Sequence, residues 1–236
     1  MLKVFPAPNT KVILESMDNF LAGEKYQRGL KRIVDIAGAF FLLVFFSPLA
    51  LFVSLLIIID SKGPVFADVP ERIGRKGKKF KMYKFRSMIN NAHYLLRTDP
   101  RFKELFNEYK RSSYKLLKDP RVTNIGKFIR RHSIDEIPQL LNVLKGEMSI
   151  VGPRAYYPDE LENQLSKYPH TKKLVNKVLS VKPGVTGLWQ VTGRSEINFD
   201  KRISIDADYV KRISLWNDLK IIFLTPIVMV SGKGAV

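Results

Sequence analysis

The chain is poor in several kinds of residue, and each shortage excludes a class of protein. It has no cysteine, which excludes disulfide bonds and thiolate metal sites and suits a reducing compartment. Its three histidines show no metal-binding spacing, so no zinc site is expected. The sequence contains neither a Walker-type glycine loop nor a dinucleotide-binding fingerprint. Disulfide-linked, zinc-binding and dinucleotide-binding proteins are therefore not the classes that the sequence indicates.

Acidic residues are scarce beside basic ones. The 236 residues include 22 Asp and Glu against 40 Lys and Arg, which gives a formal net charge of +18 at pH 7. Such a protein needs an anionic partner, and nucleic acid, an anionic membrane surface and phosphorylated substrates all qualify. A hydrophobic content of 45% is too high for a disordered chain and allows one folded domain with a smaller addition.

One long hydrophobic run predicts a membrane element. Residues 36–59, IAGAFFLLVFFSPLALFVSLLIII, contain no charged residue. At ~1.5 Å per residue, a straight helix of this length reaches roughly 36 Å, more than the ~30 Å hydrocarbon core of a bilayer. The run lies too far from the start of the chain, and is too long, for the hydrophobic region of a cleavable signal peptide.

Two features of this run complicate a simple span. Ser47 and Pro48 stand near its middle, where the proline should bend the helix and the serine can bond the freed carbonyls. Basic residues flank both ends, including Lys31 and Arg32 before it and Lys62 after it, and such residues prefer the cytoplasmic side. A re-entrant hairpin and a kinked span both fit these residues. A buried helix of a soluble protein fits poorly because the run is so uniformly apolar.

The rest of the chain predicts a helix-dominant α+β fold in three parts. We expect an arm over residues 1–24, a membrane helix-break-helix over 25–60 and a folded domain over 61–236. Within the last, glycines 74 and 77 indicate a hairpin, and residues 89–118 a charged helical lobe of open role. Further helices are predicted at 123–131, 135–144, 199–214 and 217–230, and residues 171–196 should pass from a helix into a loop rich in glycine and proline. The last is too short in its apolar part to span a membrane, so we expect an interfacial amphipathic helix or a core helix.

The adjacent acids Asp135 and Glu136 have two interpretations. Ser133 and Glu136 match a capping box, or Asp135 is itself the N-cap with Pro138 in the first helical turn. Alternatively the two carboxylates do different jobs around one ligand, one attacking or taking a proton while the other holds a hard cation. The basic residues at 130–132 would keep both acids ionised and attract a phosphorylated substrate.

Several motifs in order along the chain resemble one known family. They are KRIVDIAGAFFLLVFFSPL, MYKFRSM, DEIPQLLNVLKGEMSIVGPR, KPGVTGLWQVTGR and DADYVKRISLWNDLKII. Together, over roughly residues 28–230, they closely resemble the bacterial sugar transferases, the monotopic phosphoglycosyl transferases that use polyprenyl phosphate. The resemblance implies a monotopic protein with a kinked re-entrant membrane helix, at the bacterial inner membrane with its catalytic domain facing the cytoplasm. It also suggests a short form of the family with a single membrane hairpin.

The resemblance implies a two-step reaction. A UDP-sugar gives its sugar-1-phosphate to the enzyme and releases UMP, and undecaprenyl phosphate then takes the phosphosugar, an early membrane step of surface polysaccharide synthesis. In the family the Asp of the dyad is the nucleophile and the Glu binds Mg²⁺, which carries these roles to Asp135 and Glu136. Expected partners are the UDP-sugar, undecaprenyl phosphate and an anionic bilayer, with a homodimer left open and no nucleic acid.

The other predicted site residues follow from the motifs less directly. Lys84, Arg86 and Arg154 are expected to hold phosphates, because lysine and arginine suit that contact. By resemblance, Arg194 and Asp206 stand where the family contacts nucleotide or sugar, although structural ion pairing fits both equally well. Basic residues Lys31 and Arg32 are expected at lipid headgroups.

Two other functions stay open. A non-catalytic basic membrane adaptor would explain the charge but not the motifs around the acidic pair. A metal-dependent glycosyltransferase would use Asp135 as a base and release UDP instead of UMP. The identity of the sugar is not readable from the sequence, because selectivity rests on a few pocket contacts.

Overall fold

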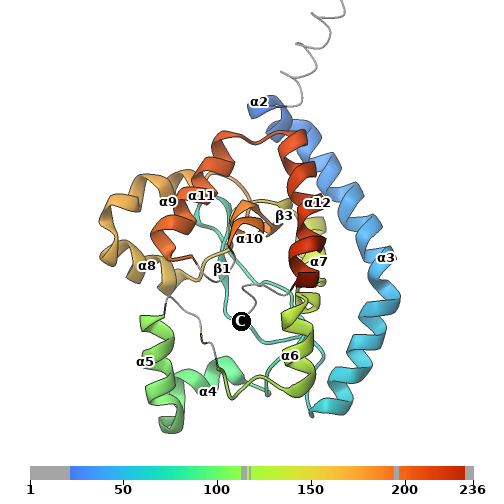
Figure 1. Ribbon diagram of the computed structural model, residues 1–236, viewed down its shortest axis with the longest axis vertical. Coiled ribbons are helices and arrows are strands. Elements are labelled where there is room, and N and C mark those ends of the chain that lie inside the picture. Colours follow the sequence, from blue (N-terminus) through green and yellow to red (C-terminus); the bar gives the residue numbers. More distant parts are fainter. Residues whose placement is uncertain (1–21, 113–115, 117, 194–196, 232–236) are drawn as a thin grey trace, which may run out of the picture.

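The computed structural model describes residues 22–112, 116, 118–193 and 197–231, which form a helical body with one long helix along its side (Figure 1). Helices predominate over a few short strands, which confirms the helix-dominant prediction. Almost all of the predicted arm, and the predicted contact residue Arg194, lie outside the described residues.

Helices and short strands alternate irregularly along the chain. The chain begins with α2 (Gly23–Lys25) and η1 (Tyr26–Leu30), which continue into α3 (Lys31–Asp60). Next come β1 (Arg72–Ile73), η2 (Arg75–Gly77), β2 (Lys79–Phe80), α4 (Ala92–Thr98), η3 (Pro100–Phe102) and α5 (Lys103–Arg111). The middle contains α6 (Asn124–Arg131), η4 (Ile134–Glu136), α7 (Gln139–Lys145) and β3 (Ser149–Val151). The last part contains α8 (Pro158–Lys167), η5 (Pro169–Thr171), α9 (Lys172–Val178), β4 (Gly184–Thr186), α10 (Leu188–Thr192), α11 (Phe199–Lys211) and α12 (Leu215–Ser231).

The apolar run forms most of α3, which bows outward along the right-hand side of Figure 1. Among the described residues, one helix is long and apolar enough to cross a membrane, and it is Tyr26–Asp60. Most of its apolar surface is not covered by protein, since Phe40, Phe41 and Phe45 are each 64% exposed. An uncovered apolar surface of this length is typical of a membrane or protein interaction site.

Pro48 lies inside α3, and the helix continues through it as one element. A proline cannot donate to the carbonyl four residues earlier, which here is that of Val44. The Ser47 hydroxyl donates to this carbonyl at 2.8 Å, as the sequence predicts for a bent helix. The expected break between two helices is therefore absent, and Lys31–Asp60 is one continuous helix that bows along its length (Figure 1). Its return to the same side of a membrane stays a prediction.

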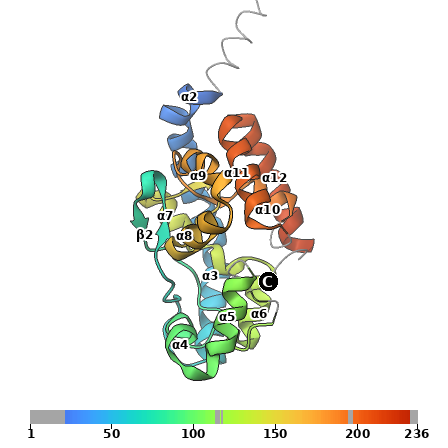
Figure 2. The same cartoon turned by 90° about the vertical axis from the view of Figure 1, so that its left-hand side faces the viewer.

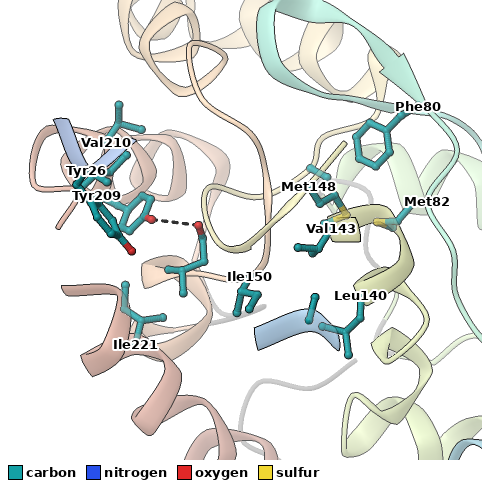
Figure 3. Packing of buried hydrophobic residues seen from close by; sticks show 14 of the residues in the cluster. Tyr26, Phe80, Met82, Leu140, Val143, Met148, Ile150, Tyr209, Val210 and Ile221 are labelled. Carbon is teal, nitrogen blue, oxygen red and sulfur yellow. Dashed lines mark hydrogen bonds between the residues drawn. The ribbon is translucent and has the colours of Figure 1, made fainter. Parts of the chain in front are cut away.

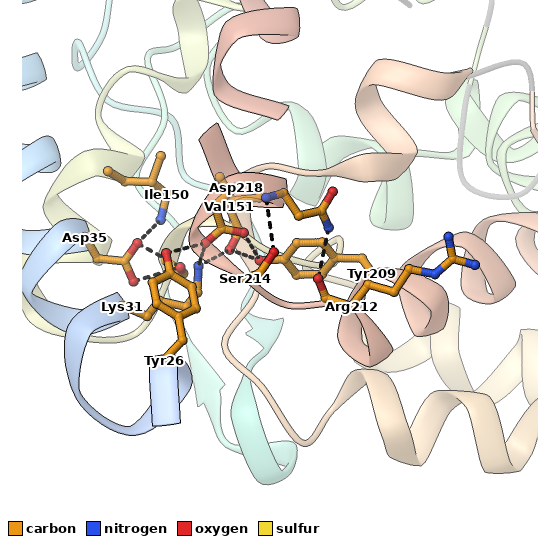
Figure 4. Close-up of polar contacts among 11 residues, drawn as sticks. Tyr26, Lys31, Asp35, Ile150, Val151, Tyr209, Arg212, Ser214 and Asp218 are labelled. Carbon is orange, nitrogen blue, oxygen red and sulfur yellow. Dashed lines mark hydrogen bonds and ion pairs between the residues drawn. The ribbon is translucent and has the colours of Figure 1, made fainter. Parts of the chain in front are cut away.

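Lys31 does not face outward toward lipid headgroups, so that prediction is wrong. Its Nζ lies 2.6 Å from Asp218 Oδ2 and also donates to the carbonyl of Val151 (Figure 4). The hydroxyls of Tyr26 and Tyr209 donate to the same carboxylate, at 2.9 and 2.7 Å. These contacts join the start of α3 to β3 and α12, because a buried charge must be paired.

Arg32 is likewise engaged by protein. Its guanidinium donates to the carbonyls of Val143 and Leu144, at 2.6 and 2.9 Å, where α7 ends. A cation at a helix C-terminus is favoured by the helix dipole. One turn further along α3, Asp35 accepts hydrogen bonds from the Ser149 hydroxyl and the Ile150 backbone N–H. The first two turns of α3 are therefore fixed to the catalytic domain by polar contacts.

The main hydrophobic core lies where α3, α7, β3, α11 and α12 meet (Figure 3). Val143, Tyr209 and Ile221 are at most 1% exposed, and each such buried side chain contributes about 1.5–3 kcal/mol. The predicted hairpin is confirmed, since β1 and β2 pair antiparallel and Phe80 and Met82 join this core. The core therefore holds the start of the membrane helix against the domain.

Strands β3 and β4 pair in parallel, with Ser149 opposite Gly184 and Val151 opposite Thr186. Glycine is required where their ends meet. A Cβ on Gly152 would lie 2.6 Å from the Gly184 nitrogen, closer than real side chains come. This close approach brings the MSIVGPR and KPGVTGLWQ motifs side by side.

Two further predictions concern the periphery. Residues 92–111 form a helical lobe of α4, η3 and α5, as predicted, at one end of the molecule (Figure 2). On α12, Trp216 and Phe223 are 64% and 74% exposed, whereas Leu215 and Ile222 pack against the main core. The apolar side chains of α12 are thus divided between a side that faces the core and a side that is exposed.

Candidate active site

The acidic pair lies in the turn η4, between α6 and α7. Ser133 precedes it with a φ of 53° and makes no capping hydrogen bond, so the capping interpretations are wrong. This left-handed residue reverses the chain after α6 and directs Asp135 inward, leaving it only 7% exposed. Its backbone carbonyl accepts a hydrogen bond from the Phe85 N–H at 2.9 Å. The turn is thereby fixed to the segment that follows the hairpin.

Lys84 comes from that segment and contacts both acids. Its Nζ lies 2.7 Å from Glu136 Oε1 and 3.4 Å from Asp135 Oδ2. Burial alone would lower the pKa of Lys84, but the two carboxylates outweigh burial and raise that pKa above its ordinary value. Lys84 is therefore a permanent cation between the two carboxylates, placed beside the site as predicted.

The electrostatic setting of Asp135 is finely balanced. Burial raises the pKa of this carboxyl above its ordinary value, while Lys84 lowers it. The negative charge of Glu136 adds to the effect of burial, and Arg130 on α6 opposes it. Burial thus favours the protonated form of Asp135, whereas the nearby cations favour the ionised form that a nucleophile requires.

The two acids open onto a cavity of about 230 Å³. Arg154 also lines it, immediately after the close contact of β3 with β4. Its guanidinium lies 5.2 Å from the centre of the Trp189 ring, which holds it by a cation–π interaction. Its backbone N–H donates to Asp206 Oδ2 at 3.1 Å. The predicted residues Asp135, Glu136, Lys84 and Arg154 are thus brought to one cavity.

Arg86 lines the same cavity, but its hydrogen bonds differ from the prediction. Its guanidinium lies at the end of α3. There it donates to the Ser61 hydroxyl and to the backbone carbonyls of residues 57 and 61–64. All five N–H donors of an arginine are then engaged, so none is left for a phosphate. The structure gives Arg86 the role of capping the membrane helix, because the last carbonyls of a helix lack partners of their own.

Asp206 also differs from the prediction. It is 0% exposed and accepts hydrogen bonds from the Arg154 backbone and, at 3.0 Å, from the Tyr156 hydroxyl. Burial raises the pKa of Asp206 to about 7 despite these bonds. It lies behind Arg154 and holds it, and does not itself face a nucleotide or sugar.

A sequence profile described as bacterial sugar transferase matches residues 26–232, most of the chain. The chain belongs to the bacterial sugar transferase family. Undecaprenyl-phosphate galactose phosphotransferase of Salmonella typhimurium is 40% identical over 229 residues, 95% of this chain and 45% of that protein. Undecaprenyl-phosphate glucose phosphotransferase of Komagataeibacter xylinus is 39% identical over 200 residues, 83% of this chain and 35% of that protein.

A shorter relative matches more evenly. The exopolysaccharide production protein ExoY of Rhizobium meliloti is 41% identical over 195 residues, which are 83% of both chains. This sugar transferase therefore spans a little under half the length of the galactose phosphotransferase, and most of the length of ExoY.

Sequence reasoning missed several residues that line the cavity of this sugar transferase, among them His93, Tyr109, Tyr157, Trp189 and Gln190. Trp189 and Gln190 stand in the GLWQ part of a motif already singled out, and this motif was the available signal. No local signal marks His93 or Tyr109, because they reach the cavity only through the packing of the lobe.

The described residues contain no group of three or more His, Cys, Asp or Glu side chains able to hold a metal. Glu136 can offer one carboxylate, with a side chain 26% exposed beside Asp135. Such a donor set fits Mg²⁺, which often binds one or two carboxylates and completes its shell with water and substrate phosphates. It does not fit a metal that needs a complete cage of protein ligands.

Proposed function

We propose that this sugar transferase moves a sugar-1-phosphate from a UDP-sugar to undecaprenyl phosphate through a covalent phosphosugar on Asp135. The products are UMP and an undecaprenyl diphosphosugar. The names of two relatives, undecaprenyl-phosphate galactose and glucose phosphotransferase, support this class of reaction. The membership of the family supports it over the whole of residues 26–232.

The observation that carries the proposal is the position of Asp135. A carboxylate oxygen that is buried, yet lines a cavity with Lys84, Arg130 and Arg154, combines a nucleophile with cations for phosphate. Phosphoryl transfer needs positioning and charge neutralisation more than elaborate covalent machinery. A basic membrane adaptor has no use for such a carboxylate in a cavity.

The first step forms the covalent intermediate. An Asp135 carboxylate oxygen attacks the phosphorus bonded to the sugar, and the bond from that phosphorus to the bridging oxygen breaks, so UMP leaves with both electrons. In the second step an oxygen of undecaprenyl phosphate attacks the same phosphorus, and the bond to Asp135 breaks. The carboxylate is regenerated, and no net proton is required. Splitting the transfer lets one site handle two large substrates in turn.

The remaining residues serve charge and position. Glu136 would hold Mg²⁺, which when bound neutralises the phosphate oxygens of the donor. Lys84 spans 2.7 Å to Glu136 and 3.4 Å to Asp135, so it orients both acids before the donor arrives. Arg154, held by Trp189 and Asp206, offers a fixed fork of donors to a phosphate.

The proposal includes the membrane setting. We infer a monotopic protein at the bacterial inner membrane, with α3 re-entrant and the cavity on the cytoplasmic side. The bend at Pro48, the basic residues on both flanks of α3 and the uncovered apolar side of α12 support it.

The reaction is tested by assaying UMP release from several UDP-sugars with Mg²⁺ and undecaprenyl phosphate. We expect UMP from the wild type and none from Asp135→Asn, because an amide is a poor nucleophile for phosphorus. The matched control Asp208→Asn makes the same change at an exposed residue paired with Lys211 and should retain full activity. Mass spectrometry of donor-treated wild type should find a phosphosugar on the peptide that contains Asp135.

The outcomes separate the competing functions. Release of UDP instead of UMP would identify a glycosyltransferase, and no release from any UDP-sugar would favour an adaptor. An active Asp135→Asn enzyme, free of wild type, would refute the nucleophile.

Topology is tested separately with single cysteines in this cysteine-free chain. Arg28→Cys and Lys62→Cys flank the apolar helix. If α3 is re-entrant, an impermeant thiol reagent should label both variants from the same side of sealed vesicles. Labelling from opposite sides would show a span.

A further inference from the structure

The lobe of α4, η3 and α5 has no role in the reaction as derived so far, yet it forms part of the cavity wall. His93 near the start of α4 and Tyr109 near the end of α5 both line the cavity that contains the acidic pair. Burial raises the pKa of Tyr109 above its ordinary value, and Tyr157, with which it shares a hydrogen bond, adds to this effect. The lobe is therefore packed onto the rest of the protein beside the cavity that contains the acidic pair.

The backbone next to His93 is held by a buried clamp. Arg121, 2% exposed, donates through one guanidinium nitrogen to the Ala92 carbonyl at 2.9 Å. Its other nitrogens contact the Asp119 carboxylate at 2.6 and 2.8 Å. On the outside of the lobe, Arg97 pairs with Asp159 of α8 at 3.3 Å. The position of His93 at the cavity wall is therefore fixed from two sides.

The His93 imidazole has no hydrogen bond to any of the residues that the structure describes. Burial, and then the positive charges of neighbouring arginines, lower the pKa of His93 to about 3. These arginines are Arg121, Arg72, Arg97 and Arg130. The ring is thus neutral at any pH at which the protein works, and it offers one donor and one acceptor.

A neutral ring among arginines is suited to one kind of ligand group. The arginines and Lys84 supply the charge that phosphates need, and an uncharged imidazole adds nothing there. Its unused donor and acceptor match groups that both donate and accept, such as a sugar hydroxyl, or the imide edge of uracil. A site built to bond such a group discriminates strongly against donors that lack it or place it differently.

We propose that His93 determines donor specificity by hydrogen-bonding an uncharged polar group of the nucleotide sugar. This inference rests on the proposed function. It gives the lobe a role in selecting the substrate, and places that role on a residue outside the acidic pair and its phosphate-binding cations.

The test compares His93→Leu, His93→Gln and the control His170→Asn, which alters an exposed histidine. UMP release is measured with UDP-galactose and UDP-glucose, which differ only at one hydroxyl, together with inhibition by UMP. We expect His93→Leu to lower kcat/KM for the better donor roughly tenfold, mainly through KM, and His93→Gln to recover part of it. The control should match wild type, and all three should melt within a few degrees of it.

Two results would support the inference and identify the group. A changed galactose-to-glucose ratio with unchanged UMP inhibition assigns His93 to the sugar. An unchanged ratio with weakened UMP inhibition assigns it to the nucleotide.

Two other results would overturn the inference. Unaltered kinetics in His93→Leu would do so, and so would an equal loss of kcat for both donors with a lower melting temperature and unchanged UMP inhibition. Because the wild type is assayed in parallel, failure of the proposed function is seen separately, as the absence of UMP from the wild type itself.

Discussion

Replacing Lys84 with methionine directly tests whether this lysine stabilises the charges of Asp135 and Glu136. Lys84→Met keeps a side chain of similar length but removes the cation that lies 2.7 Å from Glu136 and 3.4 Å from Asp135. Two adjacent carboxylates are then left without their shared partner. Because Asp135 is 7% exposed, water from the cavity replaces the lost ammonium only in part.

The expected cost follows from the burial of the three groups. Removing one partner of a buried ion pair costs about 3–5 kcal/mol. The side chains of Lys84 and Glu136 are 19% and 26% exposed, so the free energy of unfolding should fall by an amount near the lower limit, about 3 kcal/mol. For a chain of this size that lowers the melting temperature by roughly 6–12 °C.

The loss should depend on pH in a defined direction. A carboxyl whose pKa is raised in the folded protein, as that of Asp135 is, binds more protons folded than unfolded. The folded state therefore loses stability as pH rises above the ordinary carboxyl range. Without Lys84 this effect is stronger, so the deficit of Lys84→Met should be largest near pH 8 and shrink toward pH 5. In the pH profile of UMP release, the fall in rate on the acid side should occur at a higher pH than in wild type.

Lys81→Met is the matched control, because Lys81 also contacts an aspartate, Asp68, at 3.4 Å. That pair is 63% and 73% exposed, and such pairs contribute about 1 kcal/mol or less. Melting curves from pH 5 to 8 in detergent and pH profiles of UMP release are measured on both variants. If Lys84→Met matches Lys81→Met in both measurements, the proposed role of Lys84 is refuted.

Three further predictions concern the framework. Arg86→Met removes the hydrogen bonds at the end of α3, so denaturant titration should show a free energy of unfolding lower by at least about 3 kcal/mol. Normal stability with a raised KM for the donor would instead support the phosphate-binding role. Asp206→Asn cannot ionise, so its free energy of unfolding should rise relative to that of wild type by up to roughly 4 kcal/mol as pH increases from about 4 to 7, measured by denaturant titration; a constant difference would contradict the raised pKa. Gly152→Ala should destabilise strongly through its clash with Gly184, whereas Gly29→Ala, with nothing within 4 Å, should not; equal melting temperatures would exclude the clash.

Local elements could be predicted because their signals are local. Thr123 caps α6 through a hydrogen bond from the Gly126 N–H, and the helix begins where the sequence predicts. Pro48 and Ser47 are adjacent, so the freed Val44 carbonyl and the serine hydroxyl that bonds it follow from two neighbouring residues. The hairpin follows in the same way from closely spaced glycines and alternating apolar residues.

Charged residues were harder to predict, because one pattern of residues fits several partners. Lys84, Arg86, Lys31 and Arg32 are all basic residues in recognisable motifs, yet one contacts the acidic pair and three hold backbone or buried acid. Nothing within a few residues of each of them distinguishes these outcomes. A lysine or arginine in such a motif predicts contact with an anion or a carbonyl oxygen, but it does not identify which one.

The amino-acid sequence by itself determined the apolar helix, the order of most elements, the family and the importance of the acidic pair. Tertiary structure alone decided which cations meet that pair, that Arg86 and Arg32 hold helix ends, and that His93 reaches the cavity. The physical reason is the distance along the chain over which each interaction acts. Hydrophobic runs, caps and prolines act within a few residues, whereas the partner of a buried charge lies tens of residues away and is chosen by the packing that removes both from water.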